Sequence, residues 1–302
     1  MRIDIVTVFP DMVREALGHS IMKRAVERGL VTINVVNLRD FTQDRHKTTD
    51  DLPYGGGGGM VMKVEPIARA IAALTSGSSL EETNRPEEPC SPQSSAHQAT
   101  GTGDAQTTGS EGKGPRVVLT DPRGQRFDQE TARRWATESH LILICGHYEG
   151  VDDRVRQHLV TDEISIGDYI LTGGELPALV VVDAITRLQA GALGDADAPD
   201  KDTFAEDLLE YPHYTRPSDY GGWKVPEILL CGHHAEIERW RRWHQFRETA
   251  MRRPDLFERY HLSPTDEKLY HGPEPTAPLD DRTKRRKLDQ NENQEDTNGT
   301  GI

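Results

Sequence analysis

Alternating and continuous apolar runs predict an α/β domain over the first 190 residues. Short runs rich in Ile, Val and Leu are typical of buried strands, and we expect strands at 3–8, 31–35, 116–120, 141–145 and 163–166. Apolar residues at helical spacing predict helices at 11–28, 64–74, 127–138 and 176–189. Because strands and helices alternate, the sequence predicts a mainly parallel sheet with helices on its faces.

The rest of the chain divides by composition. Residues 76–114 are rich in Ser, Thr, Gly, Pro and Glu, and we expect them to be a disordered insertion in the first domain, because they bury too little apolar surface to offset their ordering entropy. Residues 191–212 are expected to form an acidic linker, 213–262 a small helical domain, and 263–302 a disordered polar tail. Within the small domain, tryptophans interleave with arginines; we favour a packed core for the aromatics and nucleic-acid contact for exposed arginines.

Composition excludes several classes of protein. Three cysteines without Cys-x-x-Cys spacing argue against a disulfide framework or a zinc site. No apolar run approaches the ~18 residues of a membrane span, and the start lacks the pattern of a signal peptide, so we expect a cytoplasmic protein with no membrane partner. The net charge of −14 is unusual for a nucleic-acid binder, but residues 237–259 hold seven arginines against four acidic residues. A local basic face matters more for phosphate contact than the total charge.

Two glycine-bearing turns follow two of the predicted strands. The first is Gly-His-Tyr-Glu-Gly at 146–150, and the second runs from Gly167 to Gly174. Ligands bind open α/β sheets outside the carboxyl ends of the strands, so the two turns are expected to form the walls of one pocket. Either turn alone is as well explained as a tight connection. A third glycine run, at 55–59, closes a polar loop over 39–60 that matches neither a P-loop nor a dinucleotide fingerprint.

The motifs along the chain resemble those of the bacterial tRNA (guanine-N1)-methyltransferases, which belong to the trefoil-knotted SPOUT superfamily. The matching segments are RDFTQDRH at 39–46, DDLPYGGGGGM at 50–60, CGHYEGVDDRV at 145–155, SIGDYILTGGELPA at 165–178, DTFAEDLLEYPHYTRP at 202–217 and GHHAEIERWR at 232–241. Several long motifs in the same order make the resemblance highly specific. It covers most of the chain outside 76–114 and the tail.

The resemblance implies a deep trefoil knot over about 115–190, with S-adenosylmethionine bound in the knotted loops. It also implies a homodimer with a shared active site, and a small all-α C-terminal domain that holds the anticodon arm of tRNA. The product would be N1-methylated guanine immediately 3′ of the anticodon. The residues expected to bind the cofactor are Leu119, Thr120, Pro122, Gly124, Gly146, Tyr148, Glu149, Gly150, Ile166, Gly167, Asp168, Tyr169, Ile170, Leu171, Gly173, Gly174 and Pro177.

Methyl transfer to guanine N1 requires a base, because N1 bears a proton and must lose it to attack. The negative charge that develops on the ring and its O6 would be stabilised by a fixed cation. By resemblance the base is Asp202 and the cation is Arg187. The sequence leaves a requirement for Mg²⁺ open.

The chain departs from the family pattern at a few positions. Asp-Pro-Arg-Gly at 121–124 stands where Ser-Pro-Gln-Gly is common, and His147 stands where arginine is frequent. Gly58 replaces a proline of the glycine-rich loop. Two other functions compete with the enzyme: a catalytically silent RNA-binding SPOUT protein, and a nucleotide hydrolase that uses the glycine run. Asp202, Arg187 and both glycine turns are present, which counts against the first, and the absence of a phosphate-loop lysine counts against the second.

Overall fold

The computed structural model describes residues 1–76, 114–194 and 202–278. The chain forms two compact units, Met1–Ala196 and Asp197–Ile302, and each is described by itself. Almost all of the predicted insertion, part of the predicted linker (195–201) and the chain beyond 278 lie outside the described residues. No helix in the described parts combines the length and the apolar character needed to cross a membrane.

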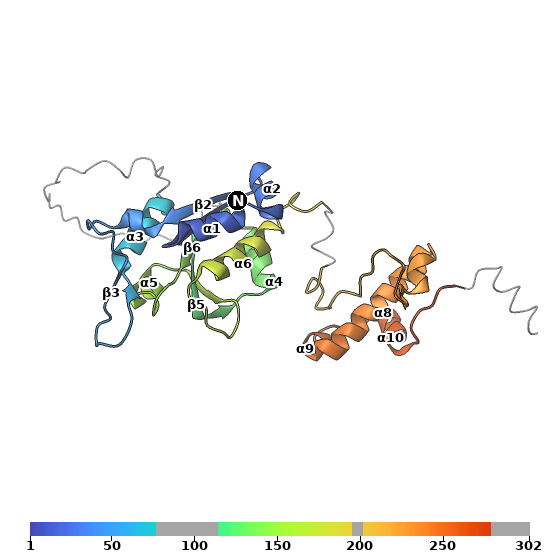
Figure 1. Cartoon of the computed structure of the whole chain (residues 1–302). Coiled ribbons are helices and arrows are strands. Elements are labelled where there is room, and N and C mark those ends of the chain that lie inside the picture. Colours follow the sequence, from blue (N-terminus) through green and yellow to red (C-terminus); the bar gives the residue numbers. More distant parts are fainter. Residues whose placement is uncertain (77–113, 195–201, 279–302) are drawn as a thin grey trace, which may run out of the picture. The chain divides into compact units, whose positions relative to one another are not determined.

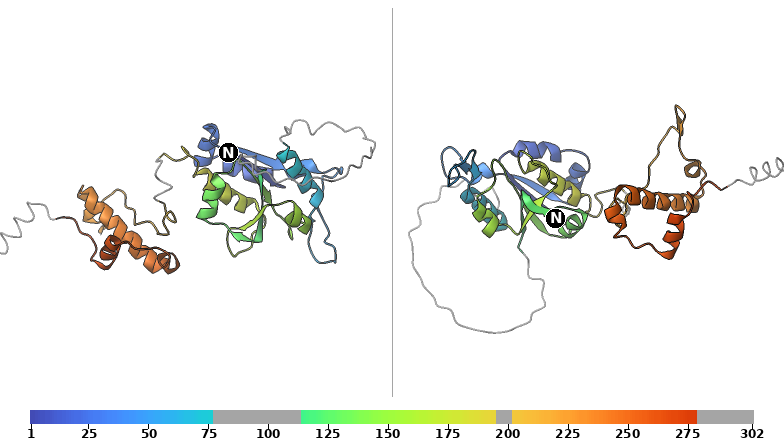
Figure 2. Two further views of the ribbon diagram at one scale, coloured as in Figure 1. Left: turned by 180° about the vertical axis from the view of Figure 1, so that it is seen from behind. Right: turned by 90° about the horizontal axis from the view of Figure 1, so that it is seen from below.

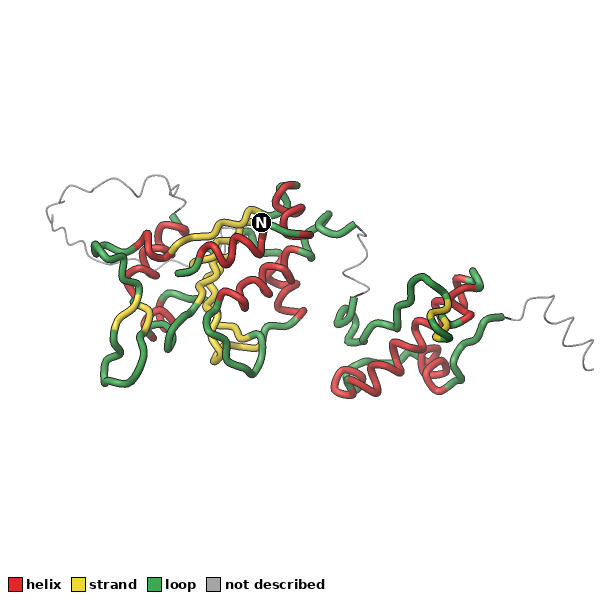
Figure 3. The backbone as a smooth tube through the Cα atoms, in the orientation of Figure 1, coloured by secondary structure: helices red, strands yellow, loops and turns green. Residues whose placement is uncertain are grey.

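The first unit is built on a five-stranded sheet in the order β2-β1-β6-β5-β7, and every neighbouring pair of strands is parallel. This confirms the predicted sheet. The strands are β1 (Arg2–Thr7), β2 (Thr32–Asn37), β5 (Arg116–Arg126), β6 (His140–Cys145) and β7 (Asp162–Ser165). Because all five are parallel, their carboxyl ends meet at one edge of the sheet. Figure 3 draws the strands as yellow tube.

Helices cover both faces of this sheet, as the chain's apolar alternation requires (Figures 1 and 2). Ile3, Ile5 and Leu143 pack on one face beneath α1 (Pro10–Leu17), α4 (Gln129–Ala136) and α6 (Glu175–Thr186). Val6 and Ile144 pack on the other face, beneath α3 (Val64–Thr75) and α5 (Asp153–His158). Strands buried on both faces carry near-continuous apolar runs, which explains their strong sequence signal.

The first predicted helix is wrong in its extent. We expected one helix over 11–28, whereas the chain forms α1 and a second helix, α2 (Ser20–Glu27). Gly18 ends α1, and Ser20 starts α2 with a φ of +51°, which no continuous helix allows. Helix α1 begins one residue earlier than predicted, because Pro10 occupies the first helical position and Asp11 lies in the first turn.

The end of the strand predicted over 116–120 also differs, because the strand continues through residues 121–124. These residues lie within β5, which pairs with β7 on both sides of a register shift between Thr120 and Gln125. The register shift lets β5 include the irregular residues 121–124 and continue to Arg126. The remaining short elements of the unit are η1 (Leu38–Phe41) and the two-stranded β3 (Asp50–Asp51) and β4 (Val61–Met62). Helix α5 was not anticipated.

The second unit is mainly helical in its described part. It contains η2 (Glu227–Leu230), α8 (His234–Arg252), α9 (Pro254–Phe257) and α10 (Pro264–His271), together with a small hairpin of β8 (Asp219–Tyr220) and β9 (Trp223–Lys224). The prediction of disorder from residue 263 is wrong for α10. Ser263 caps this helix by accepting a hydrogen bond from the Asp266 amide, and α10 packs against α8.

Candidate cofactor and active site

A cavity of about 420 Å³ lies at the carboxyl edge of the sheet in the first unit. Its walls come from the segments that follow three neighbouring strands, at 120–123 in β5, 146–151 after β6 and 164–174 after β7, with Pro177 of α6. Its volume falls within the usual range of ligand pockets. The two glycine turns therefore line one cavity, as the sequence predicts.

The first turn is held against the glycine run of the long polar loop. The Glu149 amide donates to the Met60 carbonyl at 3.0 Å, and the Met62 amide donates to the Gly150 carbonyl at 3.0 Å. A side chain at Gly59 would collide with that of Glu149, with its Cβ 2.4 Å from Glu149 Cγ. Gly59 thus lets the end of the loop pack closely against the wall of the cavity, a function that differs from the phosphate binding we considered.

The second turn closes directly on the first. The Gly174 amide donates to the Gly146 carbonyl at 2.7 Å, and Gly173 pairs with His147 in an isolated antiparallel bridge. A Cβ on Gly174 would lie 2.0 Å from Thr120 Oγ1 and 2.8 Å from the Gly146 amide nitrogen. Glycine is needed here because the Thr120 hydroxyl and the backbone at Cys145 and Gly146 lie too close for a side chain.

A buried polar cluster supports the junction of the two turns. Glu175, only 2% exposed, accepts a hydrogen bond from the Thr7 hydroxyl at 2.7 Å. His147 Nδ1 lies 3.8 Å from Glu175 Oε2 and is buried without a hydrogen-bond partner in the described structure. Burial raises the pKa of the neighbouring Cys145 thiol well above its ordinary value, and the charge of Glu175 adds to the shift. This cysteine is therefore kept as a neutral thiol.

An ion pair between Arg123 and Asp121 lies on the β5 side of the cavity. The guanidinium of Arg123 donates to Asp121 Oδ1 at 2.9 Å and holds the pKa of that carboxyl below its usual value. Both residues line the cavity and belong to the segment that departs from the family pattern. The carboxylate stays ionised and paired at neutral pH.

The structure brings together most of the residues that we expected to bind the cofactor. Those that line the cavity are Thr120, Pro122, Gly146, Tyr148, Glu149, Gly150, Ile166, Gly167, Tyr169, Ile170, Leu171, Gly173, Gly174 and Pro177. Leu119, Gly124 and Asp168 do not line it. Leu119 is fully buried in the core of the sheet, and Asp168 is exposed.

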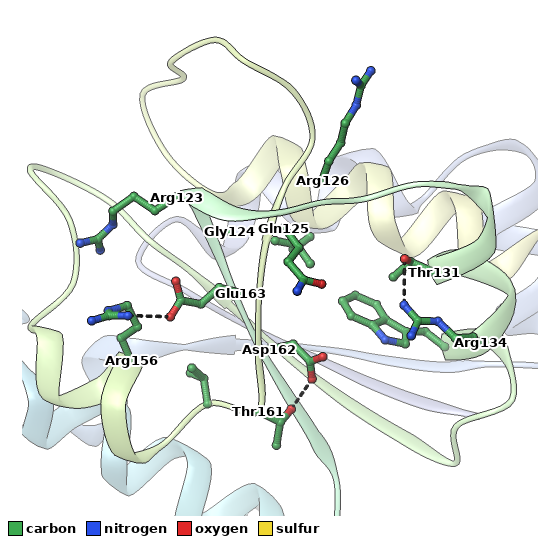
Figure 4. Close-up of a pocket in the computed structure, with 13 residues that line it drawn as sticks. Arg123, Gly124, Gln125, Arg126, Thr131, Arg134, Arg156, Thr161, Asp162 and Glu163 are labelled. Atoms are coloured by element: carbon green, nitrogen blue, oxygen red, sulfur yellow. Dashed lines mark hydrogen bonds and ion pairs between the residues drawn. The ribbon is translucent and has the colours of Figure 1, made fainter. Parts of the chain in front are cut away.

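Gly124 instead lines a separate cavity of about 340 Å³ (Figure 4). In this view the Arg126 side chain points away from the cavity, and Arg156 pairs with Glu163 at 3.6 Å. Asp162 accepts a bidentate contact from Arg116 at 2.8–2.9 Å. The carboxylates of this cavity are thus already paired within the fold.

Arg187 lies at the other end of α6 from the cavity. It is the C-cap residue, whereas Gly174 and Pro177 at the beginning of the helix line the cavity. A helix of this length spans roughly 18 Å, more than an arginine side chain can bridge. Asp202 belongs to the second unit and is half-buried there. Within one chain, the structure therefore does not bring Arg187 to the cavity.

In the second unit the tryptophans of α8 belong mainly to the core, as we favoured. Trp240 is 1% exposed and donates to Glu274 Oε1 at 2.9 Å, and Trp243 donates to the Gly272 carbonyl at 3.2 Å. The arginines are less available than expected. Arg242 is paired with Glu206 at 3.2 Å, and the guanidinium of Arg241 lies over the Tyr211 ring.

Sequence reasoning missed several residues of the cavity. They are Val61, Asp121, Arg123, His147, Val151, Asp153, Ile164, Ser165 and Thr172. His147 carried a signal, since it stands between two glycines of a turn already singled out. The described residues contain no group of three or more His, Cys, Asp or Glu side chains placed to hold a metal ion.

The chain matches known proteins over most of its length. The family model described as "tRNA (Guanine-1)-methyltransferase TrmD" matches residues 1–88 and 95–259. The "tRNA (guanine-N(1)-)-methyltransferase" of Brevibacillus brevis is 49% identical over 269 residues, which cover 89% of this chain and 96% of that protein. The protein of the same name from Anoxybacillus flavithermus is 46% identical over 268 residues, with coverage of 89% and 96%.

A solved structure shows the same relationship. The crystal structure of tRNA (m1G37) methyltransferase from Aquifex aeolicus superposes with a TM-score of 0.62 at 34% sequence identity, and the match covers 86% of this chain and 95% of that one. The family model and the relatives both span most of the chain, including the loops that form the cavity. The chain therefore belongs to the tRNA (guanine-1)-methyltransferase TrmD family.

Proposed function

We propose that the protein transfers a methyl group from S-adenosylmethionine to N1 of the guanine immediately 3′ of the anticodon in tRNA. The observation that carries this proposal is the cavity at the carboxyl edge of the sheet, which is built from the motifs shared with the family. We place the protein in the cytoplasm, where its tRNA substrate would be found.

The residues of the cavity fit S-adenosylmethionine. Gly146, Gly173 and Gly174 let the two turns approach closely enough to line one cavity, because a Cβ at any of them would meet neighbouring protein atoms. Apolar groups of Leu171 and Pro177 suit an adenine ring, and the Glu149 carboxylate suits the positive charges of the methionine portion. When bound, the cofactor would supply an electrophilic methyl group on a sulfonium.

The remaining chemistry falls to the chain's own residues. Asp202 accepts the proton from guanine N1, which turns that nitrogen into a nucleophile. Arg187 faces the negative charge that develops on the ring and O6. The walls of the cavity align the guanine with the methyl group. Well-oriented intramolecular reactions gain ~7–11 kcal/mol in activation free energy from such alignment, so alignment alone lowers the barrier to methyl transfer by several kcal/mol.

The position of Arg187 supports a site shared between two copies. Since Arg187 is too far from its own cavity, its guanidinium would serve the cavity of a second copy. A face of α6 suits such a contact, because Leu176 and Val180 are each 46% exposed although the helix is apolar nearly all round. Met12, on the neighbouring α1, is also 46% exposed and extends the apolar surface. A homodimer would bury these side chains.

We also propose the trefoil knot of the superfamily. In its support, β5 lies between β6 and β7, yet the loop after β7 returns across the end of β5 to reach Gly146. Thr120 at this end of β5 donates its hydroxyl toward the carbonyls of Ile144 and Gly174, at 3.2 and 3.4 Å. The second unit would hold the anticodon arm.

A methylation assay tests the function. Unmodified tRNA with guanine 3′ of the anticodon should accept one methyl group per molecule from S-adenosylmethionine, and nuclease digestion should release 1-methylguanosine. The same tRNA with adenosine at that position should accept none. A protein that binds both the tRNA and the cofactor without transfer would be the silent RNA-binding member that competes with this proposal. Repeating the assay after chelation with EDTA would settle the question of Mg²⁺.

A further inference from the structure

A small hairpin in the second unit presents two aromatic rings to solvent. Strands β8 and β9 pair Asp219 with Lys224 and Tyr220 with Trp223. Gly221 and Gly222 form the two-residue connection with φ values of 62° and 94°, as a tight primed turn requires. The carboxylate of Asp219 accepts a hydrogen bond from the Gly222 amide at 2.8 Å. The hairpin is thus short and has a defined shape.

The two rings are paired with each other and otherwise uncovered. Tyr220 is 69% exposed and Trp223 is 79% exposed, and their ring centroids lie 6.1 Å apart at an interplanar angle of 52°. Residues directly opposite each other on an antiparallel pair project from the same face. In contrast, Trp135 and Trp240 are almost fully buried. Large aromatic side chains left in solvent on an ordered turn mark a surface that contacts another molecule.

The charges beside the rings favour a polyanion. Between residues 213 and 226, the Lys, Arg, Asp and Glu residues are Arg216, Asp219 and Lys224. Arg216 and Lys224 are exposed and form no ion pair with any residue of the described part of the chain. The single carboxylate, that of Asp219, is already engaged by the turn. The hairpin therefore combines stacking surface with two available cations.

We propose that the β8–β9 hairpin is a base-stacking site, in which Tyr220 and Trp223 contact an unpaired nucleobase of the RNA substrate while Arg216 and Lys224 contact the adjacent phosphates. This inference rests on the proposed function, which makes tRNA the substrate. Unpaired bases are the target because their faces are free to stack on aromatic side chains, whereas bases within a duplex are covered by their neighbours.

The central experiment separates stacking from charge. Affinity of the full-length protein for unmodified tRNA is measured by fluorescence anisotropy over a series of KCl concentrations. Trp223→Ala should weaken binding by about ten-fold to a hundred-fold at every salt concentration, with an unchanged salt slope, because no cation is lost. Trp223→Phe keeps a ring and should retain most of the affinity. Lys224→Gln should instead reduce the magnitude of the slope by about one.

A direct readout identifies the stacked base. Single 2-aminopurine substitutions at the unpaired positions of the tRNA should include one whose fluorescence falls on binding the wild-type protein and not on binding Trp223→Ala. Thermal unfolding and calorimetry with S-adenosylmethionine should be unchanged in Trp223→Ala, since the ring packs against little else and lies outside the residues of the cofactor cavity.

Three outcomes would overturn the assignment. If Trp223→Ala binds tRNA as tightly as the wild type, the hairpin does not stack on RNA, and methylation by the wild type would still leave the proposed function standing. If the substitution instead changes the molar mass of the protein assembly, measured by light scattering, while RNA affinity is retained, the rings pack against protein. A wild-type protein that binds no tRNA would refute the proposed function and the hairpin's role together.

Discussion

His147 Nδ1 and Glu175 Oε2 lie 3.8 Å apart behind the junction of the two glycine turns. Glu175 is almost fully buried, and its other oxygen accepts a hydrogen bond from Thr7. No lysine or arginine in the described residues forms an ion pair with it. A buried carboxylate requires hydrogen-bonding or charged partners, and the imidazole of His147 is a polar neighbour of Glu175 at 3.8 Å, outside hydrogen-bond distance.

Replacing this nitrogen should destabilise the first unit. His147→Phe keeps an aromatic ring beside Phe9, whose centroid lies 4.9 Å away, but leaves Glu175 without the imidazole. We expect a loss of about 1–3 kcal/mol in the free energy of unfolding, measured with urea. His158→Phe, at an exposed position, is the matched control. Equal stabilities for both variants would show that His147 does not support Glu175.

Gly174 should tolerate no side chain. A methyl group there would meet Thr120 Oγ1 at 2.0 Å and the backbone of Gly146 at 2.8 Å, so the two turns would have to separate. We expect Gly174→Ala to weaken S-adenosylmethionine binding at least ten-fold in calorimetry, a loss of about 1.4 kcal/mol or more. Gly58→Ala places a methyl group where no atom lies within 4 Å, and should bind normally. Normal binding by Gly174→Ala would refute the close approach of the turns.

The sequence predicts the sheet and most of the cavity because both depend on local signals. Buried parallel strands carry long apolar runs, and close backbone approaches demand glycine, as at Gly146 and Gly174. The predictions that the structure contradicts concern features that depend on how segments pack in space. Asp168 stands between cavity residues in sequence but does not line the cavity. The break after Gly18 and the passage of β5 through 121–124 follow from packing that periodicity does not show.

In the second unit, too, sequence periodicity did not reveal which side chains are exposed. Interleaving of arginine and tryptophan drew attention to α8, where Trp240 proves to be core and Arg242 is paired with Glu206. The exposed rings, Tyr220 and Trp223, lie in a segment without periodicity, where burial cannot be read from spacing. Helix α10 was missed because its eight residues contain few apolar side chains.

Cys145 should resist alkylation even at alkaline pH. The thiolate is the reactive form, and burial together with Glu175 raises the pKa of this thiol, so folding suppresses thiolate formation. The raised pKa contributes stability that is fully present below the unfolded value of about 8.5 and declines as pH rises above it. In a Cys90→Ser/Cys231→Ser protein, iodoacetamide at pH 9 should label Cys145 only after unfolding in guanidinium. Rapid labelling of the native protein would contradict this burial.

Arg187 should affect catalysis without affecting cofactor binding. It lies at the end of α6 opposite the cavity, so Arg187→Ala should bind S-adenosylmethionine as the wild type does. The single-turnover rate should fall by roughly 10²–10³-fold, because the developing anion loses its cation. Arg28→Ala, which removes an exposed arginine that contacts the Gly191 carbonyl, serves as the control. Weakened cofactor binding by Arg187→Ala would place Arg187 beside its own cavity.

Asp202→Asn should remove the general base while keeping the size of the side chain. Single-turnover methyl transfer should fall by roughly 10²–10⁴-fold, with tRNA and cofactor affinities little changed. A rate close to that of the wild type would exclude Asp202 as the base, and Asp168 would be the next carboxylate to test.

Mixing two inactive variants tests most directly whether two copies build one methyl-transfer site. Asp202→Asn retains the cavity, and Gly146→Val blocks the cavity but retains Asp202, since the added side chain begins 3.2 Å from the Thr120 carbonyl oxygen. Co-refolding equal amounts should restore about a quarter of wild-type activity, because half of the dimers are mixed and each mixed dimer holds one intact site. Activity no higher than that of the separate variants would contradict the shared site and place the whole reaction within one chain.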